Sequence, residues 1–404
     1  YRTVGVITVG AAGDDVVAVD VTSVPSPTAA TYPTDPVKVL WAKDSTTVTG
    51  LKQTWSIPAM APATSTTWRM VLGGGFNPSN TRAAQISGTG FTAPKAFTLD
   101  PTDGSILGTI TLNSSTYTPW VGNQAFADSV IFDPSAKVYQ DDNIAKLGLQ
   151  ADLNGQIWFL YNQPSNKDDF ATARVGIDVS AKAGQSQPIY YNPAASGYGV
   201  GGAGCVAYAF GSGALYEKSA FVTGPDVGTA GNFIPQLYVA TGAKGSFTSA
   251  LSAGNIVGKP IATSWCIANC EDPDPTTHVY RTFGTKTQLT APPFMLVPRS
   301  GRGSVTALFL LYDPEYGCHG NSYIAIVDFA GNDTCSLGSS DVTFKAVDAG
   351  EGAASGFTIA GNKVLVSKSG IGQGERAHLT SPPDIAASIG GPAPPRVKWW
   401  KELK

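Results

Sequence analysis

Short apolar runs, many of them alternating with polar residues, recur along the whole chain. Runs such as VVAVDVT at residues 16–22 and KAFTLD at residues 95–100 have the length and the β-branched or aromatic content typical of strands. Turn pairs of the kind found in two-strand hairpins separate neighbouring runs. These pairs are Asp103-Gly104, Asn154-Gly155 and Gly361-Asn362. The pattern therefore predicts an all-β protein built from antiparallel hairpins.

An acidic residue followed by a turn ends a strand-like run in three places. Runs ending near Asp20, Asp100 and Asp328 share the pattern apolar-x-apolar-Asp. Recurring hairpins of this kind are typical of a β-propeller, in which four-stranded blades pack on one another. At about 45 residues a blade, the length predicts about six to eight blades. Two β-sandwiches are the alternative. No break in composition divides the chain, so we expect one domain over residues 1–404.

The composition limits the classes of function. With 46 Gly, 28 Pro and 14% charged residues, the chain is a poor helix former, and only residues 374–390 and 396–404 carry weak helical patterns. The net charge of −3 offers no basic face for nucleic acid. No apolar run approaches the roughly 18 residues of a membrane span. Because the chain begins with Tyr1 rather than Met, we expect a fragment of a longer precursor.

The five cysteines indicate disulfide bonds, which form outside the cytoplasm. Cys266 and Cys270 have C-x3-C spacing, and Cys318 and Cys335 flank a segment with the pattern of a hairpin. Two local disulfides, Cys266–Cys270 and Cys318–Cys335, are the simplest interpretation. Cys205 is then left over.

Candidate metal-binding and catalytic residues are scattered along the chain. His278 and His319 lie near cysteines, so a zinc site is the alternative to the disulfides. Asp128 and Asp152 flank an acidic stretch, but no spacing marks them as the carboxylate pair that glycoside hydrolysis needs. No G-x-S-x-G motif is present, and no Gly-rich run opens a helix. We therefore expect no enzymatic activity.

The tryptophans fall into two groups. Those in strand-like runs are expected in the core, namely Trp41, Trp55, Trp68 and Trp158. Trp399 and Trp400 lie between lysines near the end of the chain and have two interpretations. Either they pack the tail onto a blade, or they bind a partner protein, because Trp is enriched at interface hot spots.

Five segments resemble, in order, the C-terminal domain of the PilY1 family of type IV pilus tip-associated proteins. One runs from FADSVIFD to LGLQADLNGQIWFLYN and is similar to the family's acidic loop followed by a YaGDLxGxLWrfD strand pair. The others are YRTVGVITVGAAGDDVVAVDVT, LKQTWSIPAM with WRMVLGGGFN, KAFTLDPTDGSIL and PRVKWWKELK. The resemblance extends from Tyr1 to Lys404, and it depends on the ordered set rather than on one motif.

This resemblance implies a modified, quinoprotein-like β-propeller of about seven blades with irregular loop insertions. It also implies an extracellular protein at the pilus tip or outer cell surface, acting in pilus assembly, retraction control, adhesion or motility. Its partners would be minor pilins and a host or abiotic surface, and Trp399 and Trp400 would be candidates for the pilin contact. An extracellular quinoprotein-type oxidoreductase and a carbohydrate-binding propeller are the alternatives.

The resemblance also raises the question of calcium, because some family members carry a D-x-D-N-D-G calcium loop before the YaGDL strand. The corresponding segment here is FDPSAKVYQDDN. Its candidate ligands are Asp133, Ser135, Asp141, Asp142 and Asn143. Lys137 occupies a position where a ligand oxygen is expected, and no Gly supplies the sharp turn. A lengthened calcium loop and a polar connection therefore both stay open.

Overall fold

The structure is a computed structural model, and its described residues form strands and three short 3-10 helices. The described residues are 3–10, 12–22, 38–54, 56–63, 66–75, 77, 95–112, 125–132, 147–152, 155–161, 170, 172–179, 187, 189–200, 203–213, 235–243, 249–270, 272–284, 286–296, 304–314, 320–360 and 363–369. Within them, no helix is long and apolar enough to cross a membrane. The predicted all-β class is confirmed.

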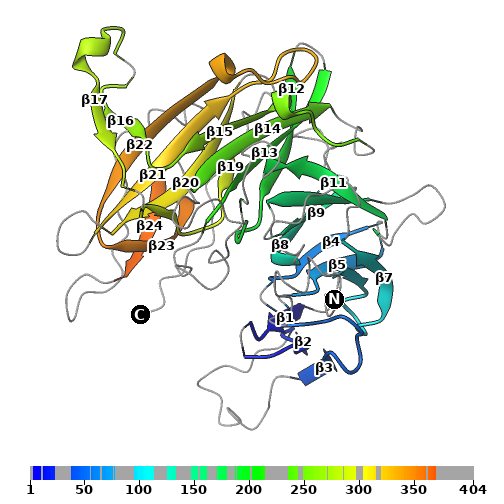
Figure 1. The fold of residues 1–404 in the computed structure, drawn as a ribbon. Helices are drawn as coiled ribbons and strands as arrows, with labels where there is room; N and C mark the ends of the chain where they lie inside the picture. The colour runs from blue at the N-terminus through cyan, green and yellow to red at the C-terminus, as the bar shows by residue number, and fades with distance from the viewer. Residues whose placement is uncertain are drawn as a thin grey trace, which may run out of the picture.

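Three sheets form the N-terminal half of the fold (Figure 1). The first contains β1 (Val4–Thr8), β2 (Val16–Asp20) and β3 (Lys38–Lys43). The second contains β4 (Ala59–Pro62), β5 (Trp68–Gly73), β6 (Lys95–Leu99) and β7 (Ile106–Thr111). The third contains β8 (Ala125–Phe132), β9 (Leu147–Asp152), β10 (Gln156–Tyr161) and β11 (Thr172–Asp178). Within each sheet, consecutive strands pair antiparallel, as expected for a meander.

Three further sheets complete the described fold. The fourth contains β12 (Ala194–Val200), β13 (Ala203–Gly211), β14 (Gln236–Ala243) and β15 (Ile256–Pro260). The fifth has seven strands, β16 (Ser264–Ala268), β17 (Val279–Thr282), β18 (Gln288–Leu289), β19 (Phe294–Leu296), β20 (Val305–Asp313), β21 (Asn321–Phe329) and β22 (Val342–Glu351). The sixth is the hairpin of β23 (Ala353–Ala360) and β24 (Lys363–Ser369). The 3-10 helices are η1 (Ala253–Asn255), η2 (Pro275–Thr277) and η3 (Ser339–Asp341).

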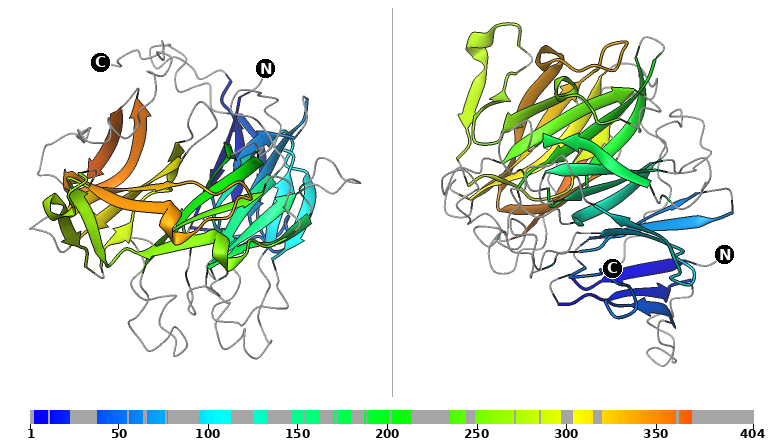
Figure 2. Two further views of the ribbon diagram at one scale, coloured as in Figure 1. Left: turned by 90° about the horizontal axis from the view of Figure 1, so that it is seen from above. Right: turned by 45° about the vertical axis from the view of Figure 1, so that its right-hand side comes forward.

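The sheets follow one another in chain order around an arc, as the view from above shows (Figure 2). The first strands of the second, third and fourth sheets approach one another, because β4 contacts β8 and β8 contacts β12. β12 in turn contacts β19 of the fifth sheet. Sheets arranged like blades converge at their first strands, so these strands lie on the inner side of the arc. The modified β-propeller is confirmed. The count of about seven blades stays a prediction, as does the single domain over residues 1–404.

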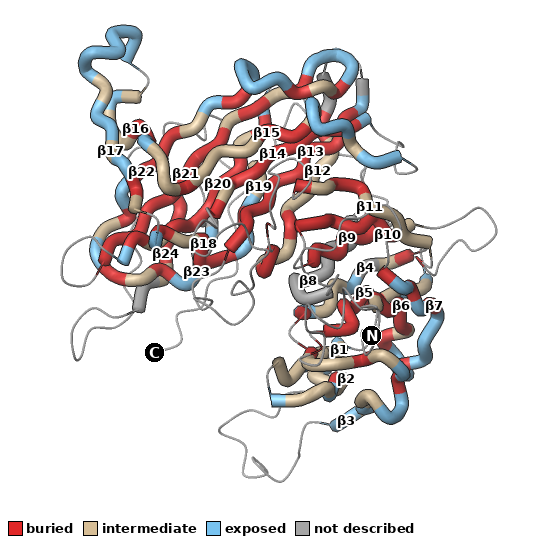
Figure 3. The backbone as a smooth tube through the Cα atoms, in the orientation of Figure 1, coloured by how far each residue is buried: buried red, intermediate tan, exposed pale blue. Residues whose placement is uncertain are grey.

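Five apolar clusters form the core, and each lies between two consecutive sheets. The alternation of a β-strand explains this arrangement, because successive side chains point to opposite faces. In β13, for example, Val206 and Tyr208 pack toward the third sheet, while Ala207 packs toward the fifth. The central strands are therefore buried on both faces, and most of the exposed backbone lies at sheet edges and turns (Figure 3).

Candidate functional site

The acidic loop and the tail tryptophans lie outside the described residues. This applies to the calcium candidates Asp133, Ser135, Asp141, Asp142 and Asn143, and to the partner-binding candidates Trp399 and Trp400. Nothing in the structure therefore bears on calcium at this loop, and both assignments stay predictions. Among the residues that the structure describes, no three His, Cys, Asp or Glu side chains gather as a metal cluster.

The structure places two disulfide bonds, one as expected and one not. Cys266–Cys270 is confirmed. The predicted Cys318–Cys335 pairing is wrong, because Cys335 is bonded to Cys205, which we expected to be left over. The segment between Cys318 and Cys335 is not a hairpin but contains the single strand β21.

The Cys205–Cys335 bond is part of a wider contact between the fourth and fifth sheets. Cys205 is in β13, and Cys335 is in the loop that follows β21. The two cysteines are separated by 130 residues in the sequence. Thr241 donates its hydroxyl to the carbonyl oxygen of Cys335 at 2.7 Å. Tyr198 accepts from the N–H of Gly331 at 3.1 Å. Three strands of the fourth sheet therefore hold one loop of the fifth.

Asp152 has a structural role rather than a catalytic one. Its carboxylate is fully buried, and it accepts hydrogen bonds from the N–H of Gln156 and from the indole N–H of Trp158, both at 2.9 Å. The backbone carbonyl of Asp152 also accepts from Ile189 at 3.1 Å. Asp152 thus stabilises the turn between β9 and β10, where Gly155 has a φ of +88°.

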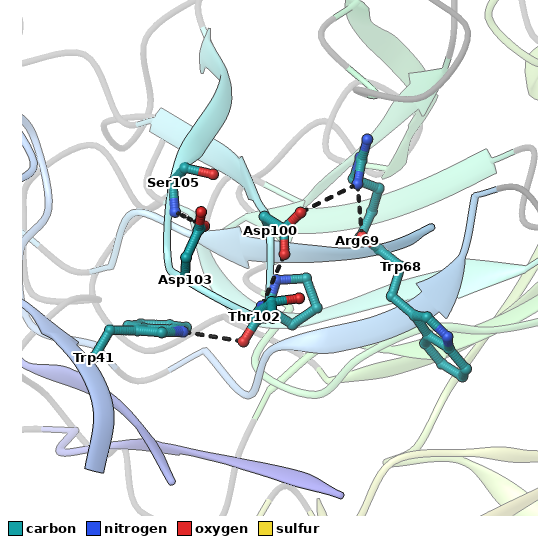
Figure 4. A network of polar contacts seen from close by, with 8 residues as sticks. Trp41, Trp68, Arg69, Asp100, Thr102, Asp103 and Ser105 are labelled. Atoms are coloured by element: carbon teal, nitrogen blue, oxygen red, sulfur yellow. Dashed lines mark hydrogen bonds and ion pairs between the residues drawn. The ribbon is translucent and has the colours of Figure 1, made fainter. Parts of the chain in front are cut away.

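The predicted turn at Asp100–Ser105 is confirmed and carries a small polar network (Figure 4). Asp100 and Asp103 accept from the N–H groups of Thr102 and Ser105, both at 2.8 Å. The indole of Trp41 in the first sheet donates to the Pro101 carbonyl at 3.0 Å. This contact joins the first and second sheets.

A salt bridge and an exposed ring lie beside this turn (Figure 4). Arg69 lies 3.7 Å from the Asp100 carboxylate and donates to the Trp68 carbonyl at 2.8 Å. Trp41 and Trp158 are buried as expected, but the expectation for Trp68 is wrong, because 54% of that side chain is exposed. Trp68 is the first residue of β5, and burial increases along that strand toward Gly73. Trp55 lies outside the described residues.

The hairpin of β16 and β17 extends away from the rest of the molecule (Figure 1). Its Cys266–Cys270 bond closes the first part of the connection, and η2 forms the tip. Asp274 caps η2 by accepting from the Thr276 N–H at 2.9 Å, and Asp272 accepts from the N–H of Asp274 at the same distance. His278 Nε2 lies 2.9 Å from the carbonyl oxygen of Asp272. The tip is therefore ordered by short polar contacts.

Two carboxylates at this tip stay ionised over a wide pH range. Hydrogen bonds from the Asp274 backbone and the Thr277 side chain lower the pKa of Asp272. Hydrogen bonds from Thr276 lower the pKa of Asp274. Both groups are fully exposed, so the hairpin presents negative charge to solvent.

Arg281 attaches the base of the hairpin to the body of the fifth sheet. Its guanidinium donates to the Asp313 carboxylate at 3.0 Å and lies 4.9 Å from the centre of the Tyr323 ring. Asp313 and Tyr323 are buried. Arg281 therefore holds the base of the hairpin in place. The contact between Arg281 and Asp313 could not be predicted from the sequence, because it joins β17 and β20, two strands that do not pair with each other.

The face-to-face sheets, which follow one another in chain order around an arc, define the class as a β-propeller. A crystal structure of the PilY1 C-terminal domain from Pseudomonas aeruginosa matches it with a TM-score of 0.54 and 15% sequence identity, over 94% of this chain and 80% of that chain. The type IV pilus biogenesis factor PilY1 of Pseudomonas aeruginosa (strain UCBPP-PA14) is 28% identical over 158 residues. The expected likeness to the PilY1 C-terminal domain is confirmed.

The sequence similarity to PilY1 extends over only part of each chain. The 158 aligned residues are 39% of this chain and only 11% of the PilY1 relative. A quinohemoprotein alcohol dehydrogenase from Comamonas testosteroni matches with a TM-score of 0.32 and 11% identity, over 84% of this chain and 57% of that chain. That similarity is too low to carry an argument about chemistry. No family model matches the chain.

Proposed function

We propose that this chain is the C-terminal propeller of a type IV pilus tip-associated protein, located outside the cell. The observation that carries this proposal is the agreement of two independent likenesses to PilY1, one in sequence over 158 residues and one in fold over 94% of the chain. In this role the propeller supports pilus assembly, the control of retraction, and adhesion or motility, through contacts with minor pilins and a surface.

We further propose that the propeller is not an enzyme but a rigid platform. Each buried carboxylate of the described residues has a structural partner, since Asp152 bonds Trp158 and Asp313 bonds Arg281. Lys345, also buried, lies 3.9 Å from Asp328. The Cys205–Cys335 disulfide and the five inter-sheet cores hold the sheets together. A carbohydrate-binding propeller would repeat exposed aromatics at equivalent blade positions.

The described aromatics do not follow such a repeat. Trp68 begins the second strand of its sheet, Tyr280 lies on a projecting hairpin, and Phe294 begins β19. The absorbance spectrum of the purified protein tests the oxidoreductase alternative. A bound quinone or haem would absorb at wavelengths above about 300 nm. A protein without such absorbance is the expected result.

The pilus role is tested in the source bacterium with the full-length protein. A strain that lacks residues 1–404 of this chain is compared with a strain that carries Asp152→Ala and with the unaltered strain. We expect pili in the sheared fraction to fall strongly in the deletion strain and to return on complementation. The protein itself is expected in the sheared pilus fraction. Normal pilus number and adhesion in the deletion strain, with no protein in that fraction, would overturn the proposal.

A further inference from the structure

One edge of the seven-stranded sheet has no neighbour among the described strands. The sheet order places β17 at its end, where β17 pairs with β16 on one side only. Val279 and Tyr280 are 45% and 58% exposed, although both are large and apolar or aromatic. Natural edge strands are normally protected by lysine, proline or an inward charge, because an open edge can pair with another chain. β17 contains no lysine and no proline, and its single charge, on Arg281, is turned inward toward Asp313.

The register identifies which backbone groups of β17 face outward. Phe283 donates its N–H to the carbonyl of Thr263 at 3.1 Å, so these two residues form a hydrogen-bonded pair. In an antiparallel ladder, bonded and non-bonded pairs alternate. Thr282 lies opposite Ser264, one position along the ladder, and is therefore in a non-bonded pair.

Tyr280 lies opposite Cys266, two positions beyond Thr282, and is in a non-bonded pair as well. Residues of non-bonded pairs direct their N–H and C=O groups away from the partner strand. The backbone groups of Tyr280 and Thr282 consequently point away from β16, toward the open edge. They form two donors and two acceptors at the spacing that an added strand requires.

The edge is held in this conformation before any partner arrives. Arg281 lies between the two outward-facing residues and is bonded to the buried Asp313. The Tyr280 hydroxyl lies 3.3 Å from His278 Nδ1, and the Cys266–Cys270 bond restrains the opposite strand. Preorganisation of this kind lowers the entropy lost on binding.

The charge beside the edge indicates the chemistry of the partner. Asp272 and Asp274 are exposed at the tip, next to the start of β17. Arg281 is the nearest cation in sequence, and it is engaged by Asp313. A basic segment is therefore attracted to this end of the hairpin, and an acidic one is repelled.

We propose that β17 is a docking edge for an extended, basic segment of a partner protein, which adds to the sheet as a further strand. Tyr280 and Thr282 would supply the main-chain hydrogen bonds, Val279 and Tyr280 the apolar contact, and Asp272 with Asp274 the charge selection. This inference rests on the proposed function of the chain as an interaction platform, and it identifies the surface and partner chemistry.

The test uses the whole chain and a fluorescently labelled peptide of alternating valine and lysine, with a valine and glutamate peptide as its counterpart. Fluorescence anisotropy measures each dissociation constant. Thr282→Pro removes one outward N–H without touching the ladder to β16, and Thr282→Val is its matched control because it keeps that N–H and the β-branched shape. Tyr280→Lys places a cation on the edge as a second, side-chain variant.

We expect the lysine peptide to bind the unaltered chain at least tenfold more tightly than the glutamate peptide. Thr282→Pro and Tyr280→Lys should each weaken that binding at least tenfold, while Thr282→Val should leave it within twofold. Circular dichroism melting checks that the variants are folded. No binding to the unaltered chain, or equal binding by Thr282→Pro and Thr282→Val, would overturn the inference.

Three further outcomes separate this inference from its alternatives. If sedimentation shows that the unaltered chain self-associates and that Tyr280→Lys abolishes this, the occupant is a second copy, and the partner proposed here is wrong. If peptide binding fails but deletion of residues 1–404 still removes pili, the docking edge is wrong and the proposed function stands. If the deletion has no effect on pili but the peptide still binds through Thr282, the edge stands and the pilus role is wrong.

Discussion

The hydroxyl of Tyr198 accepts a hydrogen bond from the backbone N–H of Gly331, which follows it by 133 residues in the chain. Tyr198 is in β12 and Gly331 is in the loop after β21, so this bond joins two sheets. Burial raises the pKa of Tyr198 and so favours the neutral hydroxyl. We expect Tyr198→Phe to leave the buried N–H without a partner.

The expected loss for Tyr198→Phe is about 1–3 kcal/mol in the free energy of unfolding, the usual cost of a buried unsatisfied donor. Urea denaturation followed by circular dichroism measures it. Tyr280→Phe is the matched control, because its hydroxyl is on an exposed side chain, and it should change stability by less than about 0.5 kcal/mol. Equal losses in the two variants would show that the bond to Gly331 contributes nothing.

The two disulfides should differ in their contribution to stability. In the chain-entropy treatment, a bond that closes about 130 residues stabilises by about 5 kcal/mol, and one that closes about five residues by about 2 kcal/mol. We therefore expect Cys205→Ala with Cys335→Ala to destabilise the protein more than Cys266→Ala with Cys270→Ala. Urea midpoints under non-reducing conditions provide the comparison. The reverse order would show that native contacts, rather than loop closure, determine the contribution of each bond.

Asp152 and Trp158 should be energetically coupled. Asp152→Asn replaces one acceptor with an NH2 group, so that two donors can face each other at the indole of Trp158. We expect this change to cost about 1–3 kcal/mol, as does the loss of other buried hydrogen bonds to a charged group. Trp158→Phe removes the indole donor. In a double-mutant cycle, the two changes together should cost less than their sum, and strict additivity would contradict the coupling.

Asp44 should make stability depend on pH at the acidic end. Hydrogen bonds from Thr46 and Thr47 lower its pKa to about 2 in the folded protein, from an ordinary value of 3.8. Because the folded pKa is below the unfolded one, the contribution of Asp44 is present above about pH 4 and is lost as the pH falls toward 2. An NMR titration of the Asp44 carboxyl measures the pKa directly.

Asp44→Asn provides the matched stability measurement for this group. The difference in melting temperature between the unaltered protein and the variant should be constant from pH 7 to about 5 and should shrink between about pH 4 and 2. Asp333 is an exposed aspartate and provides the same comparison. A difference that is independent of pH would mean that the contacts of Asp44 with Thr46 and Thr47 do not form in solution.

Local sequence signals predicted the strands and turns well, because hairpin chemistry acts over a few residues. Ala360 pairs with Lys363 across the predicted Gly361-Asn362 turn, and Asp20 and Asp100 accept hydrogen bonds from residues two positions later, as turn-forming aspartates do. Asp328 differs, since it lies within β21 and bonds the hydroxyl of Thr306 on the neighbouring strand. The apolar-x-apolar-Asp pattern therefore occurs in two structural settings, a turn at Asp20 and Asp100 and a strand interior at Asp328.

Contacts between residues far apart in the chain could not be predicted from the sequence. The pairing of Cys205 with Cys335 depends on two sheets meeting, and spacing alone favoured the neighbour Cys318. The attachment of Arg281 to Asp313 and the exposure of Trp68 have the same origin, because each depends on which sheet covers which strand end. Period-two patterns specify the two faces of a strand, but they do not specify what lies against each face.

The Cys205–Cys335 bond has a mechanical consequence. When tension is applied to the two ends of the chain, force passes through the covalent cross-link, and the residues between the cysteines carry no load. These residues, given the sequence separation of 130, could otherwise extend by roughly 440 Å at about 3.4 Å per residue. Unless the bond is reduced, that length stays unavailable to stretching, whereas β12 of the fourth sheet and β22 of the fifth lie outside the cross-linked span.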